Sequence, residues 1–525
     1  MRLSSSIKHY LLLTATCMTL NKASAQTVVF KIDARATAQT IHNIGASGCW
    51  YSEPIGMHWP EAKKEEIAKL LFSKGITKDG SPEGIGLSAW RFNIGGGSAE
   101  QGEKSGIKDP LRRVESFLNS NGTYDWNKQL GYQWFLKKAK TYGVEDLIAF
   151  SNTPPVWFTK NGLGYKTDKD FISNLKPDKY TAFASFLADV LIHFKKEGVN
   201  FKYISPINEP QWDWSNKFGE GSQEGSPWTN KEIHDEIVAL DSVLKAKKLP
   251  VSIMTTEAAM LTYLYKTGKG SYRQIQELFG DGSPQNIKGL THVPNFVAGH
   301  SYFTEKGDSM MVAIRKQLAD TTARYGIEYW QSEYSMLDNG FSESATGKRS
   351  SMDCALFLAK VINRDLTIAN AAAWHFWNAY EPGPANIDTR YFLIALHPDK
   401  GFKNGNFTPV KNLWALGNYS RFVRPGMQRL KVSRNDDMDD VKAGQDIMIS
   451  AFKDGKGQLV TVLINYTQQP RKVKLDIQHF NKHRQLSSYV TSAESGDNLK
   501  AGKLPVDANA IELKPRSVTT LVYKN

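Results

Sequence analysis

The stretch Phe201-Lys-Tyr-Ile-Ser-Pro-Ile-Asn-Glu-Pro210 decides the fold that we expect for this chain. It has the form of a short apolar strand that ends in a polar pair, Asn208-Glu209, followed by a proline. A second stretch, Ile327-Glu-Tyr-Trp-Gln-Ser-Glu-Tyr-Ser335, has the same form and carries Glu333 near its end. Helix-like sequence follows each of them, as in the strand–helix units of a parallel sheet.

Eight such strand-like segments recur along the chain at spacings of roughly 30 to 60 residues. They are Ile41–Trp50, Leu87–Gly95, Glu145–Pro155, Phe201–Pro210, Val251–Ala258, Asn295–Phe303, Ile327–Ser335 and Ala371–Ala379. Amphipathic helices are expected between them, for example at Tyr180–Lys196 and Asn230–Lys247. Eight units predict an α/β fold, a closed (β/α)8 TIM barrel, rather than an open doubly wound sheet. No G-x-G-x-x-G pattern opens a helix after the first strand, which argues against a dinucleotide-binding fold.

The composition is that of a large folded protein. The chain has 525 residues, of which 41% are hydrophobic and 23% charged, and this mixture excludes disorder, collagen and coiled coils. Its 66 Lys and Arg side chains against 53 Asp and Glu give a formal net charge of +13. Because this excess is spread along the chain without a long basic run, we expect no nucleic-acid partner.

The first 25 residues have the three parts of an export signal. Arg2 and Lys8 precede the apolar stretch Tyr10–Leu20, and Ala23-Ser-Ala25 forms an A-x-A cleavage pattern. We therefore expect residues 1–25 to be a cleaved signal peptide and the protein to be secreted, periplasmic or at the cell surface. A buried N-terminal helix is the alternative. No later segment reaches the roughly 20 apolar residues of a transmembrane helix.

Cysteine usage sets a limit on covalent and metal stabilisation. Once the signal is removed, only Cys49 and Cys354 remain, so at most one disulfide can form, and the sequence leaves open whether it does. Two cysteines are too few for a thiolate zinc site.

After Pro425-Gly426 the sequence pattern changes from strands alternating with helices to strands alone. Ile447–Phe452, a glycine turn at Asp454–Gly457 and Gln458–Tyr466 predict a β-hairpin, and alternating segments continue to the end of the chain. We predict an all-β module of roughly 100 residues, a β-sandwich, that packs tightly on the barrel because no low-complexity linker separates the two.

Catalytic groups of a (β/α)8 enzyme lie at the carboxyl ends of the strands. Glu209 follows the fourth strand and Glu333 lies at the end of the seventh, on opposite sides of a barrel mouth. Two carboxyl groups that face each other across a cleft can cleave a glycosidic bond, one as proton donor and the other as nucleophile or base. A salt bridge is the alternative for a single strand-end glutamate. The pairing of the two favours the catalytic interpretation.

The sequence resembles glycoside hydrolase family 30, a family of retaining glycosidases in clan A. Ile204–Pro210 is similar to the acid/base motif of that family and Trp330–Tyr334 to its nucleophile motif. Asn418–Gly426 and Pro515–Val522 resemble its barrel-to-sandwich segment and its last strand. The resemblance implies a barrel over residues 41–426 and a sandwich built from residues 26–40 and 427–525.

The same resemblance implies the roles of the site residues. Glu209 would be the general acid/base and Glu333 the nucleophile. Four further residues would bind or position substrate: Asn208 at the sugar 2-hydroxyl, Arg91 beside Glu333, Tyr302 at the oxygen of the nucleophile, and His300 at the sugar pocket. A buried arginine staple and a core histidine are the alternatives for Arg91 and His300.

Aromatic residues near the strand ends are candidate platforms for sugar rings. Trp50, Trp157 and Trp377 are the favoured ones, whereas core packing is an equal alternative for Trp212 and Trp374. Trp214, Asn93 and Glu257 are further residues near the mouth, although Glu257 could instead cap a helix.

The substrate is less constrained than the chemistry. Phe150–Trp157, Asn208–Trp214 and Gly221–Gly225 are similar to the branch of the family that cleaves β-1,6-galactan internally, in the side chains of arabinogalactan. The resemblance implies a double displacement with carboxyl groups roughly 5–5.5 Å apart, no metal and no cofactor, and we expect a monomer with a polysaccharide or oligosaccharide substrate. The alternatives are a β-1,6-glucanase, a xylanase, a glucosylceramidase or a non-catalytic carbohydrate-binding protein.

Overall fold

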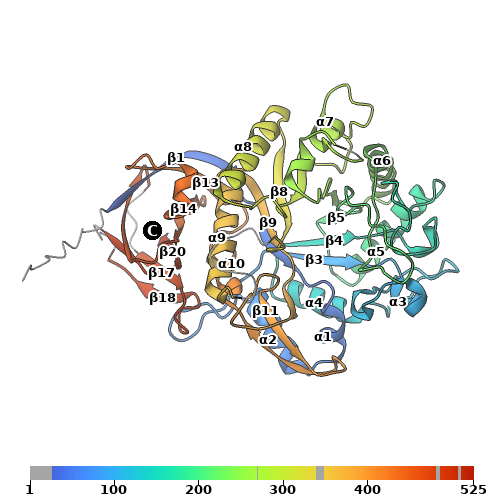
Figure 1. Ribbon diagram of the computed structural model, residues 1–525, viewed down its shortest axis with the longest axis horizontal. Coiled ribbons are helices and arrows are strands. Elements are labelled where there is room, and N and C mark those ends of the chain that lie inside the picture. Colours follow the sequence, from blue (N-terminus) through green and yellow to red (C-terminus); the bar gives the residue numbers. More distant parts are fainter. Residues whose placement is uncertain (1–26, 269, 339–347, 481–484, 506–509, 525) are drawn as a thin grey trace, which may run out of the picture.

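A computed structural model of the protein describes residues 27–268, 270–338, 348–480, 485–505 and 510–524 (Figure 1). The signal peptide expected at residues 1–25 lies outside the described residues. Two modules lie side by side in Figure 1: a barrel of strands with helices around it, and a smaller β module that contains β1 and the C-terminal strands. Among the described residues, no helix is both long and apolar enough to cross a bilayer.

The barrel is built from the eight predicted strand segments. Its strands are β2 (Asn43–Ser47), β3 (Ala89–Ile94), β4 (Asp146–Ser151), β5 (Tyr203–Ser205), β6 (Ser252–Ile253), β7 (Phe296–His300), β8 (Glu328–Tyr334) and β9 (Ala371–Phe376). They pair in parallel in the order β6-β5-β4-β3-β2-β9-β8-β7. Beyond β6 the chain closes the ring, because the Ala298 amide donates to the Thr255 carbonyl at 2.7 Å and the His300 amide to that of Ala258 at 2.8 Å. The predicted closed barrel is confirmed.

Side chains from the strands fill the barrel interior, so it is a packed core and not a pore. Trp330 on β8 stacks on Phe296 of β7 with ring centroids 4.2 Å apart, and both rings are buried. Every residue of β3, β4 and β9 is buried, as expected for parallel strands covered by helices on the outside. A site can therefore form only at the ends of the strands and in the loops that follow them.

Helices surround the barrel. They are α1 (Ser52–His58), α2 (Glu61–Phe72), α3 (Ser98–Gln101), α4 (Leu130–Thr141), α5 (Tyr180–Lys196), α6 (Asn230–Ala246), α7 (Gln274–Phe279), α8 (Asp308–Tyr325), α9 (Ser351–Thr367), α10 (Lys411–Ser420) and the single turn α11 (Asp440–Ala443). Four short 3-10 helices lie at Gly102–Ser105, Pro110–Arg112, Val156–Phe158 and Leu261–Leu264. The two long predicted helices are present, and α6 begins at a capping box in which Thr229 and Glu232 satisfy each other's backbone amides.

The β module is one mixed sheet of nine strands in the order β18-β17-β20-β15-β14-β13-β1-β16-β19. Its strands are β1 (Val28–Thr40), β13 (Gln428–Arg434), β14 (Ile447–Lys453), β15 (Gln458–Asn465), β16 (Arg471–Gln478), β17 (Gln485–Thr491), β18 (Lys500–Lys503), β19 (Ile511–Leu513) and β20 (Ser517–Lys524). A small sheet of β10 (Tyr380–Pro382), β11 (Ile394–Pro398) and β12 (Gly405–Pro409) lies beside the barrel. The packed β side domain is confirmed, with its strands joined in one sheet.

Alternation along the strands gives this sheet two buried faces. On β15, Leu459 and Leu463 pack in a core of the β module itself, whereas Val460 and Val462 belong to the main core that continues into the barrel. β1 pairs with β13 antiparallel and with β16 in parallel, which brings the start of the described chain into the sheet. The domain boundaries at residues 40/41 and 426/427 stay a prediction.

Buried hydrogen bonds lock the two modules together. Asn418 of α10 donates to the Thr491 hydroxyl at 2.7 Å and accepts from the Thr520 hydroxyl at 2.9 Å. All three residues are fully buried. The two cysteines left open by the sequence, Cys49 and Cys354, are both free and buried.

Candidate active site

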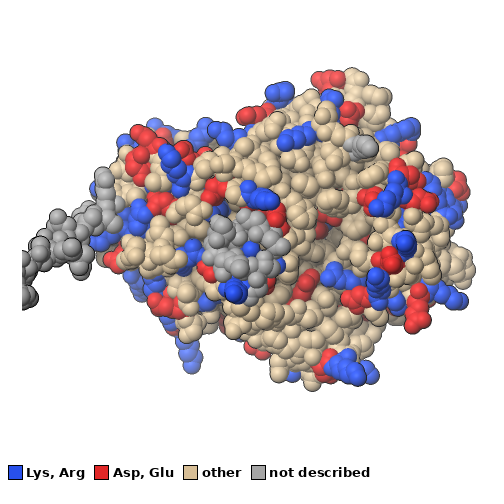
Figure 2. All heavy atoms as spheres, in the orientation of Figure 1, with Lys and Arg blue, Asp and Glu red and all other residues tan. Residues whose placement is uncertain are grey.

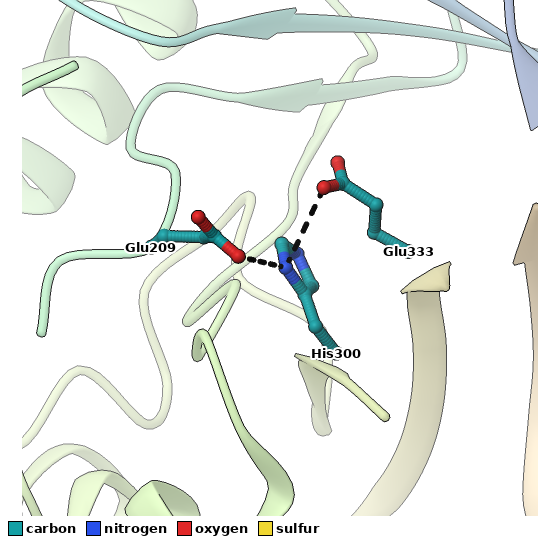
Figure 3. Close-up of side chains that lie close together, drawn as sticks. All are labelled: Glu209, His300 and Glu333. Carbon is teal, nitrogen blue, oxygen red and sulfur yellow. Dashed lines mark hydrogen bonds and ion pairs between the residues drawn. The ribbon is translucent and has the colours of Figure 1, made fainter. Parts of the chain in front are cut away.

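Glu209 and Glu333 lie at the carboxyl end of the barrel, where Figure 3 shows them on either side of His300. Glu333 is within β8, whereas Glu209 lies four residues beyond the end of β5. Glu209 has a positive φ of 45°, an uncommon backbone conformation for a residue with a side chain. Its amide donates to the Glu257 carbonyl at 3.0 Å, which holds this conformation in place.

A buried cation contacts Glu333. Arg91 of β3 donates from Nη1 to Glu333 Oε2 at 2.7 Å and to the Ser332 carbonyl at 3.0 Å. The Tyr302 hydroxyl donates to the other oxygen, Glu333 Oε1, at 3.1 Å. These bonds fix both oxygens of the Glu333 carboxyl group.

His300 lies between the two carboxyl groups (Figure 3). Its Nδ1 is 2.9 Å from Glu209 Oε1 and 3.7 Å from Glu333 Oε1, and its Nε2 is 3.1 Å from Glu257 Oε2. Complete burial favours the neutral ring, but the charge of Glu333 and the hydrogen bonds to Glu209 and Glu257 outweigh it and raise the pKa of His300 to about 10. The ring is therefore an imidazolium that donates from both nitrogens.

Glu257 is the counter-ion beneath the site. Its side chain is fully buried and contacts His300, Arg91 Nη2 at 3.5 Å and the Ser332 hydroxyl. Burial acts to raise the pKa of Glu257, but Arg91, His300 and Ser332 together hold it at about 2. Glu257 therefore stays ionised and orients both cations of the site. The sequence placed it near the mouth without assigning it a role.

Charge balance explains how the two strand-end glutamates differ. Three carboxyl groups, Glu209, Glu257 and Glu333, face two cations, Arg91 and His300. One proton more makes the cluster neutral. Burial raises the pKa of Glu209 above its ordinary value, although the hydrogen bond from His300 acts against this. Glu209 is therefore the group of the cluster that most readily takes this proton.

A cleft of about 670 Å³ opens over these groups. It is lined by Trp50, Arg112, Asn152, Asn208, Glu209, Trp212, Asp213, Trp214, Ser215, Asn216, Gln223, Tyr302, Phe303, Glu333, Ser335, Leu337, Trp377, Glu381 and Tyr391. Trp50 and Trp377 meet edge to face with ring centroids 5.2 Å apart. Asn208 Oδ1 is buried without a hydrogen-bond partner, as expected of a group that a ligand hydroxyl would satisfy.

The structure gathers most of the predicted site residues at this cleft, but not all. Trp157 does not line it; the indole is half-buried and donates from Nε1 to the Leu118 carbonyl at 2.8 Å. Arg91 and His300 lie buried beneath the carboxylates and act on them instead of lining the cleft. Trp374 is in the core, where it donates to Asp365 at 2.9 Å. The catalytic and binding roles of the predicted site residues stay a prediction.

Sequence reasoning missed the residues that loops bring to the cleft. The Arg112 guanidinium lies 3.8 Å over the Trp50 ring, a cation–π contact that holds both side chains. Glu381, in β10, also lines the cleft, and burial raises the pKa of its carboxyl group to about 7. Neither residue follows a barrel strand directly, and no motif marks it in the sequence.

Glu209, His300 and Glu333 are also the described residues whose ligand atoms, all within 4.8 Å of one another, could hold a metal ion. Each of these atoms already has a hydrogen bond or ion pair within the cluster. An imidazolium cannot bind a metal, because both of its ring nitrogens carry protons. The charges present therefore fit proton transfer better than metal binding.

A barrel with two glutamates facing a cleft lined by indoles is the arrangement of an O-glycosyl hydrolase. The model of O-Glycosyl hydrolase family 30 matches residues 27–386, so the chain belongs to this family. Figure 2 shows Lys and Arg interspersed with Asp and Glu over the face it draws.

Three relatives define what the chain is similar to. An endo-β-1,6-galactanase of Hypocrea rufa is 23% identical over 403 residues, which cover 71% of this chain and 74% of that protein. A conserved exported protein from Bacteroides fragilis has a TM-score of 0.87 at 33% identity, covering 94% of this chain and 100% of that one. The catalytic domain of a GH30 xylanase C from Talaromyces cellulolyticus has a TM-score of 0.64 at 18% identity, covering 95% of this chain and 100% of that one, and shows the fold alone.

Proposed function

We propose that the protein is an exported, retaining β-glycosidase that cleaves β-1,6-galactan internally, in the side chains of arabinogalactan. The observation that carries the retaining mechanism is the separation of the two glutamates, whose nearest oxygens lie within 4.8 Å of each other. Retaining enzymes place their carboxyl groups roughly 5–5.5 Å apart, whereas inverting enzymes need roughly 6.5–9.5 Å to admit a water molecule.

In the first step, Glu333 attacks the anomeric carbon while the bond from that carbon to the leaving oxygen breaks. The proton of Glu209 moves to the leaving oxygen, so the aglycone departs as an alcohol. His300 and Arg91 stabilise the carboxylates as the charge moves from Glu333 to Glu209. Asn208, whose side-chain oxygen has no partner, would bind the 2-hydroxyl of the sugar.

In the second step, water attacks the same carbon and the ester bond to Glu333 breaks. Glu209 takes a proton from the water and is thereby ready for the next cycle. Two inversions at the anomeric carbon keep the β configuration of the product. The whole cycle needs only the side chains of this cluster.

Two lines of support favour galactan. The segments Phe150–Trp157 and Asn208–Trp214 resemble the galactan-cleaving branch of the family, and the relative from Hypocrea rufa bears that activity in its name. The cleft volume of about 670 Å³ is within the 300–1,000 Å³ of sites that hold drug-sized ligands, so it has room for more than one sugar ring. Internal cleavage is the mode that such a cleft favours.

Product analysis tests the proposal. The mature protein is incubated with β-1,6-galactan, β-1,6-glucan and glucuronoxylan, and early products are separated by chromatography. We expect short galacto-oligosaccharides from the first substrate only. Release of monosaccharide alone from the outset would contradict internal cleavage, and products from glucan or xylan alone would contradict the substrate.

Glu333→Gln tests the roles of the two glutamates. The variant should lose turnover by at least about a thousandfold yet still bind oligosaccharide, because the amide keeps the shape and cannot form the glycosyl ester. Glu209→Ala should be rescued by azide with a β-glycosyl azide as product, since azide replaces water and needs no base. Wild-type activity in Glu333→Gln would reject the mechanism, and no hydrolysis of any polysaccharide by the wild type would favour a non-catalytic binding protein.

A further inference from the structure

A second cavity lies where the barrel meets the β module, at the opposite end of the barrel from the active site. It has a volume of about 570 Å³ and is lined by the end of α9, by β13 and β14, and by the segment around α11. Figure 1 shows β13 and β14 beside α9 at this junction. α9 leads into the amino-terminal end of β9 here, whereas the catalytic groups lie at the carboxyl ends of the strands.

Arg429 of β13 reaches from the sheet to the base of the barrel in this cavity. Its side chain donates to the amide oxygens of Gln39 at 2.7 Å and Asn370 at 2.8 Å, both of which are neutral. Its third nitrogen, Nη1, donates to the Leu430 carbonyl at 3.4 Å, so the described partners of Arg429 are neutral oxygens, although the residue is only 8% exposed. Burial without a counter-ion lowers the pKa of Arg429 to about 10. Its charge is therefore desolvated and uncompensated.

Arg364 of α9 lines the same cavity and is also incompletely paired. It is 3% exposed, and its Nε has no hydrogen-bond partner among the described residues. The nearest carboxylate oxygen is that of Asp440, 3.8 Å from Nη1, and that side chain is mostly exposed to solvent. The Ser450 hydroxyl, on β14 in the same lining, is buried beside the Tyr419 hydroxyl. Two buried cations thus line one cavity.

The remaining charges of the cavity lie at its rim. Arg434 is already paired with Asp436 and Asp446. Lys431 is exposed, and Asp437 is an exposed acid that faces solvent. The deep part of the cavity therefore carries positive charge and the rim a mixture of both signs.

We propose that this junction cavity is a binding site for a small oxyanion, held by Arg429 and Arg364. A guanidinium group matches the planar edge of a carboxylate, sulfate or phosphate with two parallel hydrogen bonds, and the low-polarity surroundings strengthen them. An apolar ligand would leave both charges uncompensated. The oxyanion is either free in solution or the carboxylate of a uronic acid in a polysaccharide.

Bound anion would link the two modules. Arg364 belongs to the barrel and Arg429 to the β module, so an anion between them adds a contact across the junction. Binding to the folded state alone stabilises it in proportion to the logarithm of ligand concentration. This inference does not depend on the reaction at the barrel mouth.

Thermal unfolding of the mature full chain tests the site. The midpoint Tm is measured in sodium sulfate, sodium phosphate and sodium glucuronate, each against sodium chloride at matched ionic strength. We expect a saturable rise of about 3 °C or more with at least one of the three. A response to glucuronate alone would identify the polysaccharide source, and a response to sulfate or phosphate the free anion.

Two variants separate this site from general salt effects. Arg429→Gln should abolish at least half of the saturable rise, whereas Lys472→Gln, which removes an exposed charge on β16, should keep all of it. A rise that is equal in Arg429→Gln and wild type would overturn the proposal. Calorimetric titration of the wild type does not depend on the folding of the variant: one site per chain is expected, and no binding of any of the three anions would also overturn it.

Discussion

Replacing His300 by asparagine tests whether an imidazolium sets the ionisation of the two catalytic glutamates. Asparagine keeps an N–H near the position of Nδ1 and removes the positive charge. In the folded protein, Nδ1 lies 2.9 Å from Glu209 Oε1 and 3.7 Å from Glu333 Oε1. Both carboxyl groups therefore lose a nearby cation, and each becomes easier to protonate.

The distances give the size of the effect. At an effective dielectric constant of about 20, unit charges separated by 2.9 Å and 3.7 Å attract by about 5.7 and about 4.5 kcal/mol. The open cleft screens both groups, so roughly 2 kcal/mol of each interaction is retained. Since about 1.4 kcal/mol corresponds to one pH unit, the alkaline limb of the pH profile of kcat/KM should move to higher pH by about one unit or slightly more.

The sign follows from the role of Glu209. The alkaline limb reports the loss of its proton, and losing a nearby cation shifts this limb upward. Initial rates of reducing-sugar release over the whole profile measure this. Tyr302→Phe is the matched control, because it removes a neutral donor whose hydrogen bond goes to Glu333, so the alkaline limb should stay in place. A His300→Asn profile that is lower but unshifted would refute the cationic assignment.

Three further substitutions test the cleft, the junction and a buried acid. Trp377→Ala should raise KM about five- to tenfold with a smaller effect on kcat, because the ring is expected to stack on substrate and contributes about 1–1.5 kcal/mol. Asn418→Ala should lower the free energy of unfolding by about 1–3 kcal/mol in urea titrations, because it removes two buried side-chain hydrogen bonds, one to the Thr491 hydroxyl and one from the Thr520 hydroxyl. Burial raises the pKa of Glu224 to about 7, so its ionisation costs the folded state stability as pH rises from about 4.5 to about 7, and Glu224→Gln should flatten that slope by up to about 3 kcal/mol. An unchanged KM in Trp377→Ala, an unchanged free energy of unfolding in Asn418→Ala, or an unchanged pH slope of stability in Glu224→Gln would contradict the corresponding expectation.

The barrel could be predicted from the sequence because its signal is local. Each strand is a short apolar segment followed by a helix, and segments such as Asp146–Ser151 fall inside the predicted range Glu145–Pro155. The places of Glu209 and Glu333 followed from strand counting, since alternate positions around a closed ring determine which strand ends face each other. The family assignment rests on motifs at these same two strand ends.

The electrostatics beneath the two glutamates could not be predicted in this way. Glu257 and His300 are 43 residues apart and meet only because β6 and β7 close the ring. Whether a strand-end histidine is neutral or charged depends on which carboxylates surround it, and that is a property of three dimensions. Trp157 shows a related limit: a position near a strand end does not fix where the ring lies, and its indole donates to the Leu118 carbonyl and is not among the residues that line the cleft.

The residues of the site differ in how they are held in place, and this difference bears on substrate specificity. Arg91, Glu257 and His300 come from the barrel and its strand ends and are fixed by buried ion pairs, so changing any of them would leave a partner charge unpaired at a cost of several kcal/mol. Arg112 lies in a 3-10 helix and Glu381 in the short strand β10, both outside the barrel strands and only partly buried. The sugar recognised should therefore be set by the residues of the cleft that lie outside the barrel strands, while the cleavage chemistry stays constant. This explains why proteins that share the barrel can differ in the polysaccharide they cleave.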